Sequence, residues 1–241
     1  MSANPKFDTT NYNYTLEQIE QIAEGENRKY DPSRLIELKP LDPHHYAETM
    51  LDVTFDFKYL SHNGTPQCKL FYTEAVTWVS SKHIPKKKSE KMTPQEIADE
   101  CGAYEIYVKP RTIIVDQSIL DKGYWFKEKF DILHECGHLI LHPHGFSDEQ
   151  SNYKPHAYGD PLQGMNLIEH HANRFAAALL MPRDITKTTY RDLMNTLSIV
   201  PQSESDKIGS VIEKMADMAK VSFDSMMYRL ANLKLISIID N

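Results

Sequence analysis

The sequence predicts an α+β fold that is mostly helical, with a small antiparallel or mixed sheet packed on one buried helix. Three observations support this prediction. Short β-prone segments lie in the first half of the chain, and amphipathic helical patterns fill the second half. Between them, residues 126–142 place apolar side chains around nearly the whole circumference of a helix, which is typical of a helix buried in a core.

The length and composition of the chain exclude several classes of protein. Its 241 residues are enough to bury a sizeable core in one domain with a small appendage. The formal net charge of -7 gives no general electrostatic basis for binding nucleic acid. No apolar run approaches the ~20 residues that span a bilayer. We therefore expect a globular protein without a membrane partner.

The N-terminus and the cysteines predict the cellular compartment. Residues 1–11 are polar and contain no apolar segment of the kind that directs export. The three cysteines, Cys68, Cys101 and Cys136, are widely spaced and include no C-x-x-C pair. Such an odd count of isolated cysteines is typical of reduced thiols in the cytosol. We expect a cytoplasmic protein.

The predicted strands all precede the buried helix. Residues 53–59 alternate apolar and polar side chains, as in a half-buried strand. A less regular β-prone segment covers residues 69–79, and residues 104–109 and 112–116 follow as two strands joined at Pro110. Between these segments, the lysine-rich residues 80–92 are predicted to form a solvated loop.

Helix-start signals place the early helices. A short helix is predicted over residues 15–23, and Asp42-Pro43 begins the next one. The adjacent His44 and His45 that follow cannot face one metal ion from one helix face, so we expect both in solvent. Thr93 to Glu96 form a capping box that opens a further helix, and Gly102 closes it.

After the buried helix, residues 143–163 form a long segment without periodicity, and the helical patterns then resume. The helices predicted in this half cover residues 167–180, 184–197 and 205–219, and a last one begins at Val221-Ser222.

The buried helix contains an H-E-x-x-H motif formed by His134, Glu135 and His138. Residues four apart lie on the same face of a helix, so both histidines can offer a nitrogen to one metal ion. Glu135 projects about 100° further round and can reach a water on that metal as a general base. The alternative is a pair of core histidines bonded to backbone, but a divalent cation satisfies two buried imidazoles directly. Cys136 points away from both histidines, which favours a core role.

A catalytic zinc ion needs a third protein ligand, and the sequence offers two candidates. His144 stands six residues after His138, as in the longer pattern H-E-x-x-H-x-x-G-x-x-H, but Leu141 occupies the glycine position that lets the chain turn back. The other candidate is Glu169, which shares a strip with the small residues Ala172 and Ala176. Such a strip allows the close approach of two helices that a shared metal requires.

At this point the sequence resembles the ImmA/IrrE family of zinc metallopeptidases. The resemblance covers roughly residues 102–236, while the first hundred residues match only loosely. It is carried by residues 134–142 (HECGHLILH), by Glu169-x-x-Ala172-Asn173-x-Phe175-Ala176-Ala177, by Leu179-Leu180-Met181-Pro182, and by Val221-Ser222 followed by Tyr228-Arg229-Leu230 and Leu233.

The resemblance implies a minimal thermolysin-like zincin fold with a Zn²⁺ cofactor. His134, His138 and Glu169 match its zinc ligands, and Glu135 matches its catalytic base. Asn173 matches a position suited to accept a hydrogen bond from the second nitrogen of a ligand histidine.

The family also implies a substrate, because known members cleave a helix-turn-helix repressor and so induce genes of mobile elements or stress responses. The sequence departs from many members at His171, where they carry a second acidic residue. His171 then either competes for the metal or faces solvent with His170.

The expected domain organisation has three parts. Residues 1–40 form an N-terminal extension, residues 41–200 the zincin-like metallopeptidase domain, and residues 201–241 a helical pair that resembles a helix-turn-helix and packs on the core. A rival hypothesis is a non-catalytic, metal-containing regulatory module that binds a repressor or DNA. Direct nucleic-acid binding is not expected, because the C-terminal pair carries as many acidic as basic residues.

The donor that would stabilise the oxyanion of the reaction cannot be assigned from spacing. The candidates are His142, His144, Tyr153, His156 and Tyr158.

Overall fold

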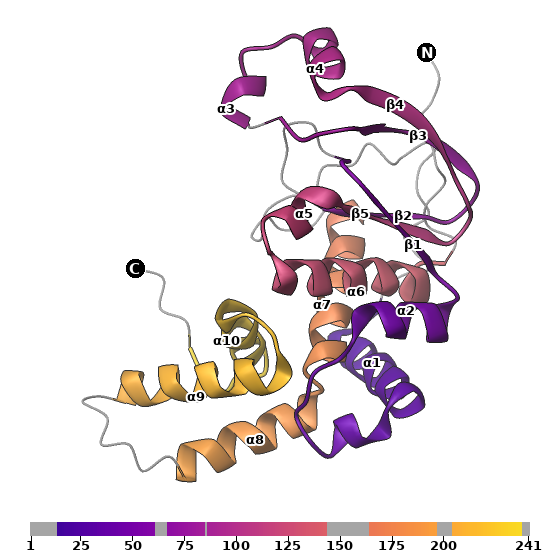
Figure 1. The fold of residues 1–241 in the computed structure, drawn as a ribbon. Coiled ribbons are helices and arrows are strands. Elements are labelled where there is room, and N and C mark those ends of the chain that lie inside the picture. Colours follow the sequence, from indigo (N-terminus) through magenta and orange to yellow (C-terminus); the bar gives the residue numbers. More distant parts are fainter. Residues whose placement is uncertain (1–13, 61–66, 85, 144–163, 197–203, 238–241) are drawn as a thin grey trace. The chain divides into compact units, whose positions relative to one another are not determined.

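The computed structural model describes residues 14–60, 67–84, 86–143, 164–196 and 204–237 (Figure 1). These residues form helices and two small sheets, which confirms the predicted α+β class. Four of the residues considered above as metal ligand or oxyanion donor lie outside this range, namely His144, Tyr153, His156 and Tyr158. None of the helices in the described ranges is long and apolar enough to cross a membrane.

The helices are α1 (Leu16–Tyr30), α2 (Pro43–Leu51), α3 (Lys86–Ser89), α4 (Pro94–Cys101), α5 (Gln117–Asp121), α6 (Trp125–Leu141), α7 (Gly164–Leu180), α8 (Arg183–Thr196), α9 (Glu204–Ala219) and α10 (Phe223–Asn232), with a 3-10 helix η2 (Pro32–Leu35). The strands are β1 (Thr54–Lys58), β2 (Cys68–Phe71), β3 (Ala75–Ser80), β4 (Ala103–Val108) and β5 (Thr112–Asp116).

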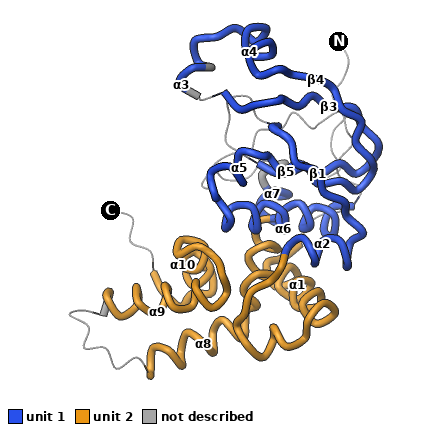
Figure 2. Tube along the Cα trace, viewed as in Figure 1, with its two compact units in different colours: residues 1–13, 43–172 blue, residues 14–42, 173–241 orange. Residues whose placement is uncertain are grey.

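The chain divides into two compact units, which Figure 2 shows in different colours. Unit 1 contains the described residues of 43–172, with all five strands and helices α2 to α6. Unit 2 contains residues 14–42 and the described residues of 173–241, so segments far apart in the sequence fold into one unit. Helix α7 begins in unit 1 and ends in unit 2. The domain boundaries expected from the sequence stay a prediction.

The three-stranded sheet of unit 1 has β5 at its centre, in the order β1-β5-β2. Strand β5 runs parallel to β1 and antiparallel to β2, so the sheet is mixed. All five residues of β5 are buried, as expected for a central strand under a helix. Helix α6 packs against β2 and β5, which confirms the predicted sheet on the H-E-x-x-H helix.

The strand pairing differs from the simple order of the sequence. The β-prone segment 69–79 splits into two strands, and β3 pairs with β4 in a separate antiparallel sheet. Consecutive strands β4 and β5 therefore belong to different sheets. Sequence periodicity predicts where a strand lies but not which strand it pairs with, because side chains alternate between the two faces of a sheet whatever the partner strand is.

Two local expectations were wrong, and one short helix was missed. The segment 80–92 was expected as a loop but contains the single-turn helix α3. Helix α5 was not predicted, although Asp116 caps it by accepting a hydrogen bond from the Ser118 backbone at 2.9 Å. His45 is exposed as expected, but His44 is only half-exposed, because its Nε2 lies 2.9 Å from a carboxylate oxygen of Glu128 on α6 and its ring packs on Phe55.

Capping signals read from the sequence are confirmed. Both hydrogen bonds of the capping box are present at Thr93 and Glu96 at the start of α4. Gly102 ends that helix with a φ of 63°, in the left-handed region that favours glycine. Thr15 caps α1 in the same way, and α1 extends further than predicted, to Tyr30.

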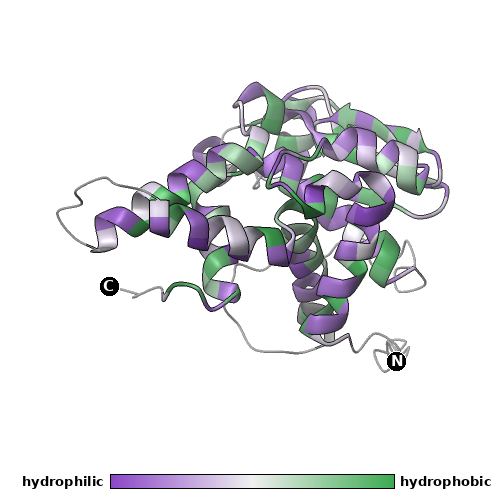
Figure 3. Cartoon of the chain, turned by 90° about the horizontal axis from the view of Figure 1, so that it is seen from below, coloured by the Kyte–Doolittle hydropathy of each residue, from purple (hydrophilic) through white to green (hydrophobic). Residues whose placement is uncertain are grey.

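Unit 2 is a helical cluster in which α9 packs against both α8 and α10. The helices are amphipathic, and Figure 3 shows hydrophobic and hydrophilic residues interspersed along the helices of the chain. Apolar side chains of α9 and α10 form a buried cluster, which contains Val211, Ile212, Met215, Ala216, Ala219, Met226 and Leu230, while Phe223 at the start of α10 is exposed.

Two buried arginines of unit 2 bind the C-terminal end of α7. Nη2 of Arg34 donates to the carbonyl oxygens of Leu179 at 3.1 Å and Leu180 at 2.9 Å. Nε of Arg229 donates to the carbonyl of Met181 at 2.9 Å. The last carbonyls of a helix have no partner inside it and carry partial negative charge, so the two guanidinium groups satisfy and stabilise this end.

Candidate metal centre

Helix α6 places His134 and His138 one turn apart on the same face, as their spacing predicts. Their Nε2 atoms lie 2.9 Å apart. His138 is 5% exposed and His134 is half-buried. Both histidines therefore direct the same nitrogen into one protected position.

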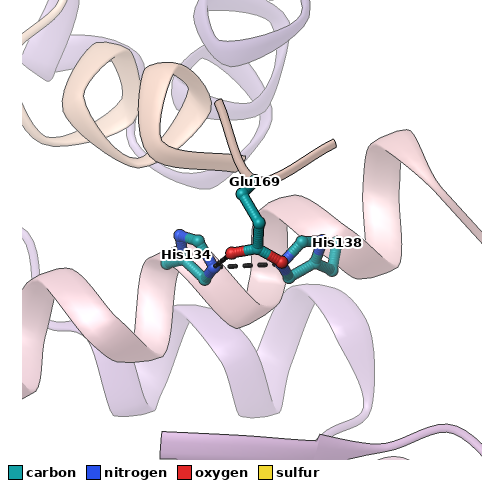
Figure 4. A group of neighbouring side chains, drawn as sticks. All are labelled: His134, His138 and Glu169. Atoms are coloured by element: carbon teal, nitrogen blue, oxygen red, sulfur yellow. Dashed lines mark hydrogen bonds and ion pairs between the residues drawn. The ribbon is translucent and has the colours of Figure 1, made fainter. Parts of the chain in front are cut away.

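Glu169 on α7 brings a carboxylate to that position (Figure 4). Its Oε2 lies 3.1 Å from Nε2 of His134, and its Oε1 lies 3.3 Å from Nε2 of His138. The two helices are separated by more than twenty residues of sequence, yet their side chains converge on one point within unit 1. Of the two candidates for a third ligand, Glu169 is placed beside the histidines, and His144 lies outside the described residues.

The arrangement of these three side chains fits a metal ion. Zinc bonds of about 2.0–2.1 Å in a tetrahedron place neighbouring ligand atoms about 3.3 Å apart. The three separations seen here, 2.9, 3.1 and 3.3 Å, are close to that value. Two imidazoles and one carboxylate are a donor set that catalytic zinc sites use. In the described part of the chain, the three residues form a group able to hold a metal ion.

The electrostatics of the group suit a cation. Burial lowers the pKa of His138, which keeps its imidazole neutral with a lone pair to offer. Burial alone would raise the pKa of Glu169, but hydrogen bonds with His134 and His138 outweigh it and lower that pKa below its usual value. Glu169 is therefore a carboxylate, the form that binds metals.

Glu135 lies beside the cluster without joining it. Burial raises the pKa of its carboxyl group to about 8, with the negative charges of Glu169 and Asp131 adding to the shift. The backbone of Leu70 on β2 forms a hydrogen bond with this carboxyl group and opposes the shift. The acid is thus held between the metal cluster and the sheet, where a general base would stand.

The raised pKa predicts a pH dependence of stability in the metal-free protein. The folded carboxyl group of Glu135 keeps its proton up to about pH 8, whereas the unfolded group loses it near 4.5. The folded state then binds more protons, so stability due to this group falls as pH rises from 4.5 to 8. Glu135→Gln, which mimics the protonated acid, is expected to gain stability relative to wild type over this range.

The measurement is urea unfolding of chelator-treated wild type and Glu135→Gln at pH 5, 6.5 and 8. The stability difference should grow steadily with pH. Parallel curves for the two proteins would show that Glu135 ionises normally in the folded chain.

Two further histidines lie behind the cluster. His142, immediately after α6, is 0% exposed, and His171 on α7 is 1% exposed. Their rings stack with centroids 5.8 Å apart and planes 12° apart. The expectation that His171 faces solvent is wrong, because it is buried against His142. Its side chain is also not among the three whose ligand atoms come together. Burial, together with the neighbouring His138 and His171, lowers the pKa of His142 to about 3.

The three cysteines and Asn173, which the sequence analysis also considered, are buried or half-buried. Cys136 is fully buried, and burial raises the pKa of its thiol, so it is the core residue that was predicted. Cys68 and Cys101 are also buried, and no disulfide bond joins the three described cysteines. Asn173 is half-buried, and its role beside a ligand histidine stays a prediction.

The pairing of His142 with His171 was missed in the sequence. The spacing of His138 and His142 places these two one turn apart, but no local pattern links His142 to His171.

One family model matches the chain. It is Peptidase_M78, described as the IrrE N-terminal-like domain, and it covers residues 126–231. The matched region begins just inside α6 and ends in α10, so it includes both helices that carry the candidate ligands. This confirms the resemblance drawn from the motifs, and with the α+β architecture it indicates a zincin-like fold. No curated protein matches the sequence.

Proposed function

Since residues 126–231 carry an IrrE N-terminal-like domain of the Peptidase_M78 family, we propose that the chain is a zinc-dependent endopeptidase. The family supports a metal-dependent peptidase in general. The observation that supports this proposal most directly is the convergence of His134, His138 and Glu169 on one point, with the half-buried acid Glu135 beside it.

The residues of the centre divide the chemistry between them. A zinc ion held by His134, His138 and Glu169 would supply a Lewis acid that polarises the substrate carbonyl and lowers the pKa of water. Glu135 would take the proton of the attacking water on its carboxylate and return it to the leaving amine nitrogen. A cation nearby favours the charged form of Glu135, which is the form a base requires.

The edge of strand β2 supports a peptide substrate. Among the described strands, β2 has only β5 as a neighbour, so β2 is an edge strand whose outer side pairs with no other described strand. The Asp116 backbone N–H donates to the Gln67 carbonyl at 3.0 Å, which makes these residues a hydrogen-bonded pair. In an antiparallel ladder, hydrogen-bonded pairs alternate with pairs whose backbone groups point away from each other. The backbone N–H and C=O of Leu70 therefore point toward the outer edge of β2, where the backbone of Leu70 forms its hydrogen bond with Glu135.

An extended peptide that adds to this edge as a strand would pass beside the general base. Strand addition uses the backbone of the substrate and needs no free terminus, which favours cleavage inside a chain. We therefore propose an endopeptidase and not an exopeptidase.

The substrate is proposed from the family resemblance. It is a helix-turn-helix transcriptional repressor of a mobile element or stress response, cleaved at a specific site in the cytoplasm. The C-terminal helices do not favour the rival reading of a DNA-binding module, because their apolar stripe is used inside unit 2.

The test combines metal content with cleavage. Wild type, Glu169→Ala and His170→Ala are dialysed, and zinc is measured by elemental analysis. Each protein is then incubated with helix-turn-helix proteins encoded by genes near its own, and the products are mapped by mass spectrometry. His170 is the matched control because it neighbours Glu169 but is exposed.

We expect one zinc per chain in wild type and His170→Ala, and loss of zinc in Glu169→Ala. Cleavage at one site should occur in the first two proteins and stop with a chelator. Zinc binding without cleavage of any protein or of an unbiased peptide library would overturn the proposed activity.

A further inference from the structure

The buried side chain of His142 lies directly behind one of the proposed metal ligands. Helix α6 ends at Leu141, and the backbone N–H of His142 donates to the carbonyl of His138 at 2.9 Å. This bond holds His142 one turn beyond His138. Nδ1 of His142 lies 3.4 Å from Nδ1 of His138, within hydrogen-bond distance.

The chemistry of the metal site fixes the direction of that hydrogen bond. His138 presents Nε2 to the cluster, 3.3 Å from Glu169 and 2.9 Å from His134. A neutral imidazole has one N–H, so a ligating Nε2 leaves the proton on Nδ1. The Nδ1–H of His138 then donates, and the Nδ1 lone pair of His142 accepts. His142 therefore carries its own proton on Nε2.

His171 fixes the plane of the accepting ring. It stacks on His142 with only 12° between the ring planes, and both side chains are shielded from solvent. The hydrogen bond to His138 depends on the direction of the His142 lone pair, which rotates with the ring. The residue that holds the ring comes from α7, which also carries Glu169.

We propose that His142 is a positioning residue of the metal centre, which accepts the Nδ1–H of His138 and so orients Nε2 of that ligand. This inference rests on the proposed metal site. It adds a partner for one ligand histidine and leaves open the expected role of Asn173. Partners of this kind fix the tautomer of a ligand and commonly change metal affinity by about 10–100-fold.

The test uses three substitutions in the full-length protein. His142→Leu removes the acceptor and keeps an apolar volume in the core. His142→Asn keeps an acceptor, because the side-chain oxygen of asparagine can stand near the position of Nδ1. His170→Leu changes an exposed histidine and controls for the loss of any imidazole. Zinc affinity is measured by competition with a chelator, and thermal unfolding reports whether each variant folds.

We expect His142→Leu to bind zinc about 10–100-fold more weakly than wild type. His142→Asn should recover most of that loss, and His170→Leu should bind as wild type does. A His142→Leu protein that binds zinc as tightly as wild type would overturn the proposal. So would equal losses in the Leu and Asn variants, because packing alone would then explain the effect.

A spectroscopic measurement keeps the inference testable if His142→Leu does not fold. In the ¹⁵N spectrum of zinc-loaded wild type, His138 should ligate through Nε2 with a protonated Nδ1, and His142 should be protonated at Nε2. Ligation of His138 through Nδ1 would overturn the positioning role while leaving the metal site intact. Absence of zinc from the wild type would overturn the metal site and this inference together.

Discussion

Glu135→Gln is expected to bind zinc as wild type does and to lose peptide cleavage by a factor of about 10²–10⁴. The side chain is not among the three that form the metal cluster, so its charge is not needed to hold the ion. Glutamine has the same shape and can still accept a hydrogen bond from the backbone of Leu70. Only the ability to take a proton from water is lost.

The measurement is the single-turnover rate of cleavage of the substrate found with wild type, together with the zinc content of each protein. Glu128→Gln is the matched control, because it makes the same change on the same helix at a carboxylate that binds His44. That control should cleave as wild type does. Full activity of Glu135→Gln would exclude Glu135 as the base, and loss of zinc would show that it supports the metal.

Arg229→Met is expected to lower the free energy of unfolding by about 3–5 kcal/mol. The guanidinium group is 1% exposed and makes two hydrogen bonds with Glu20, at 2.5 and 2.8 Å, besides the one with Met181. Methionine fills a similar volume but leaves the Glu20 carboxylate and the Met181 carbonyl without this partner. The Glu20 side chain is only 16% exposed, and removal of one member of such a largely buried ion pair is costly because the other charge stays behind.

Urea unfolding of zinc-loaded protein measures this loss. Arg183→Met is the matched control in the same unit, since its ion pair with Glu17 is exposed and screened by water. That control should unfold nearly as wild type does. The double variant Glu20→Gln with Arg229→Met should recover part of the loss, because it removes the stranded charge. Equal stability of Arg229→Met and wild type would show that the pair contributes nothing.

Much of the candidate site could be predicted from the sequence because it follows helix geometry. The spacing of His134 and His138 fixes their common face through the 3.6-residue period, which a sequence displays directly. Helical spacing also places Glu169 on a strip with Ala172 and Ala176, but its match to a zinc ligand comes from the family resemblance. The same holds for the capping box at Thr93, whose two hydrogen bonds join residues only three apart.

The parts that could not be predicted depend on contacts between distant segments. The ion pair of His44 with Glu128 joins positions 84 residues apart, and nothing in either segment specifies the other. The pairing of β3 with β4 is another case, because strand pattern does not identify a partner. The stacking of His142 on His171 requires α6 and α7 to be placed first.

The binding of α7 by two arginines also has a consequence for synthesis on the ribosome. Arg34 is made early, but its carbonyl partners Leu179 and Leu180 follow 145 and 146 residues later. Arg229, the partner of Glu20, is made 209 residues after it. At about 5–20 residues per second, this is a delay of roughly 10–40 s. Helix α1 therefore emerges long before these partners are made, and the contacts with Arg229 can form only after residue 229 has been synthesised.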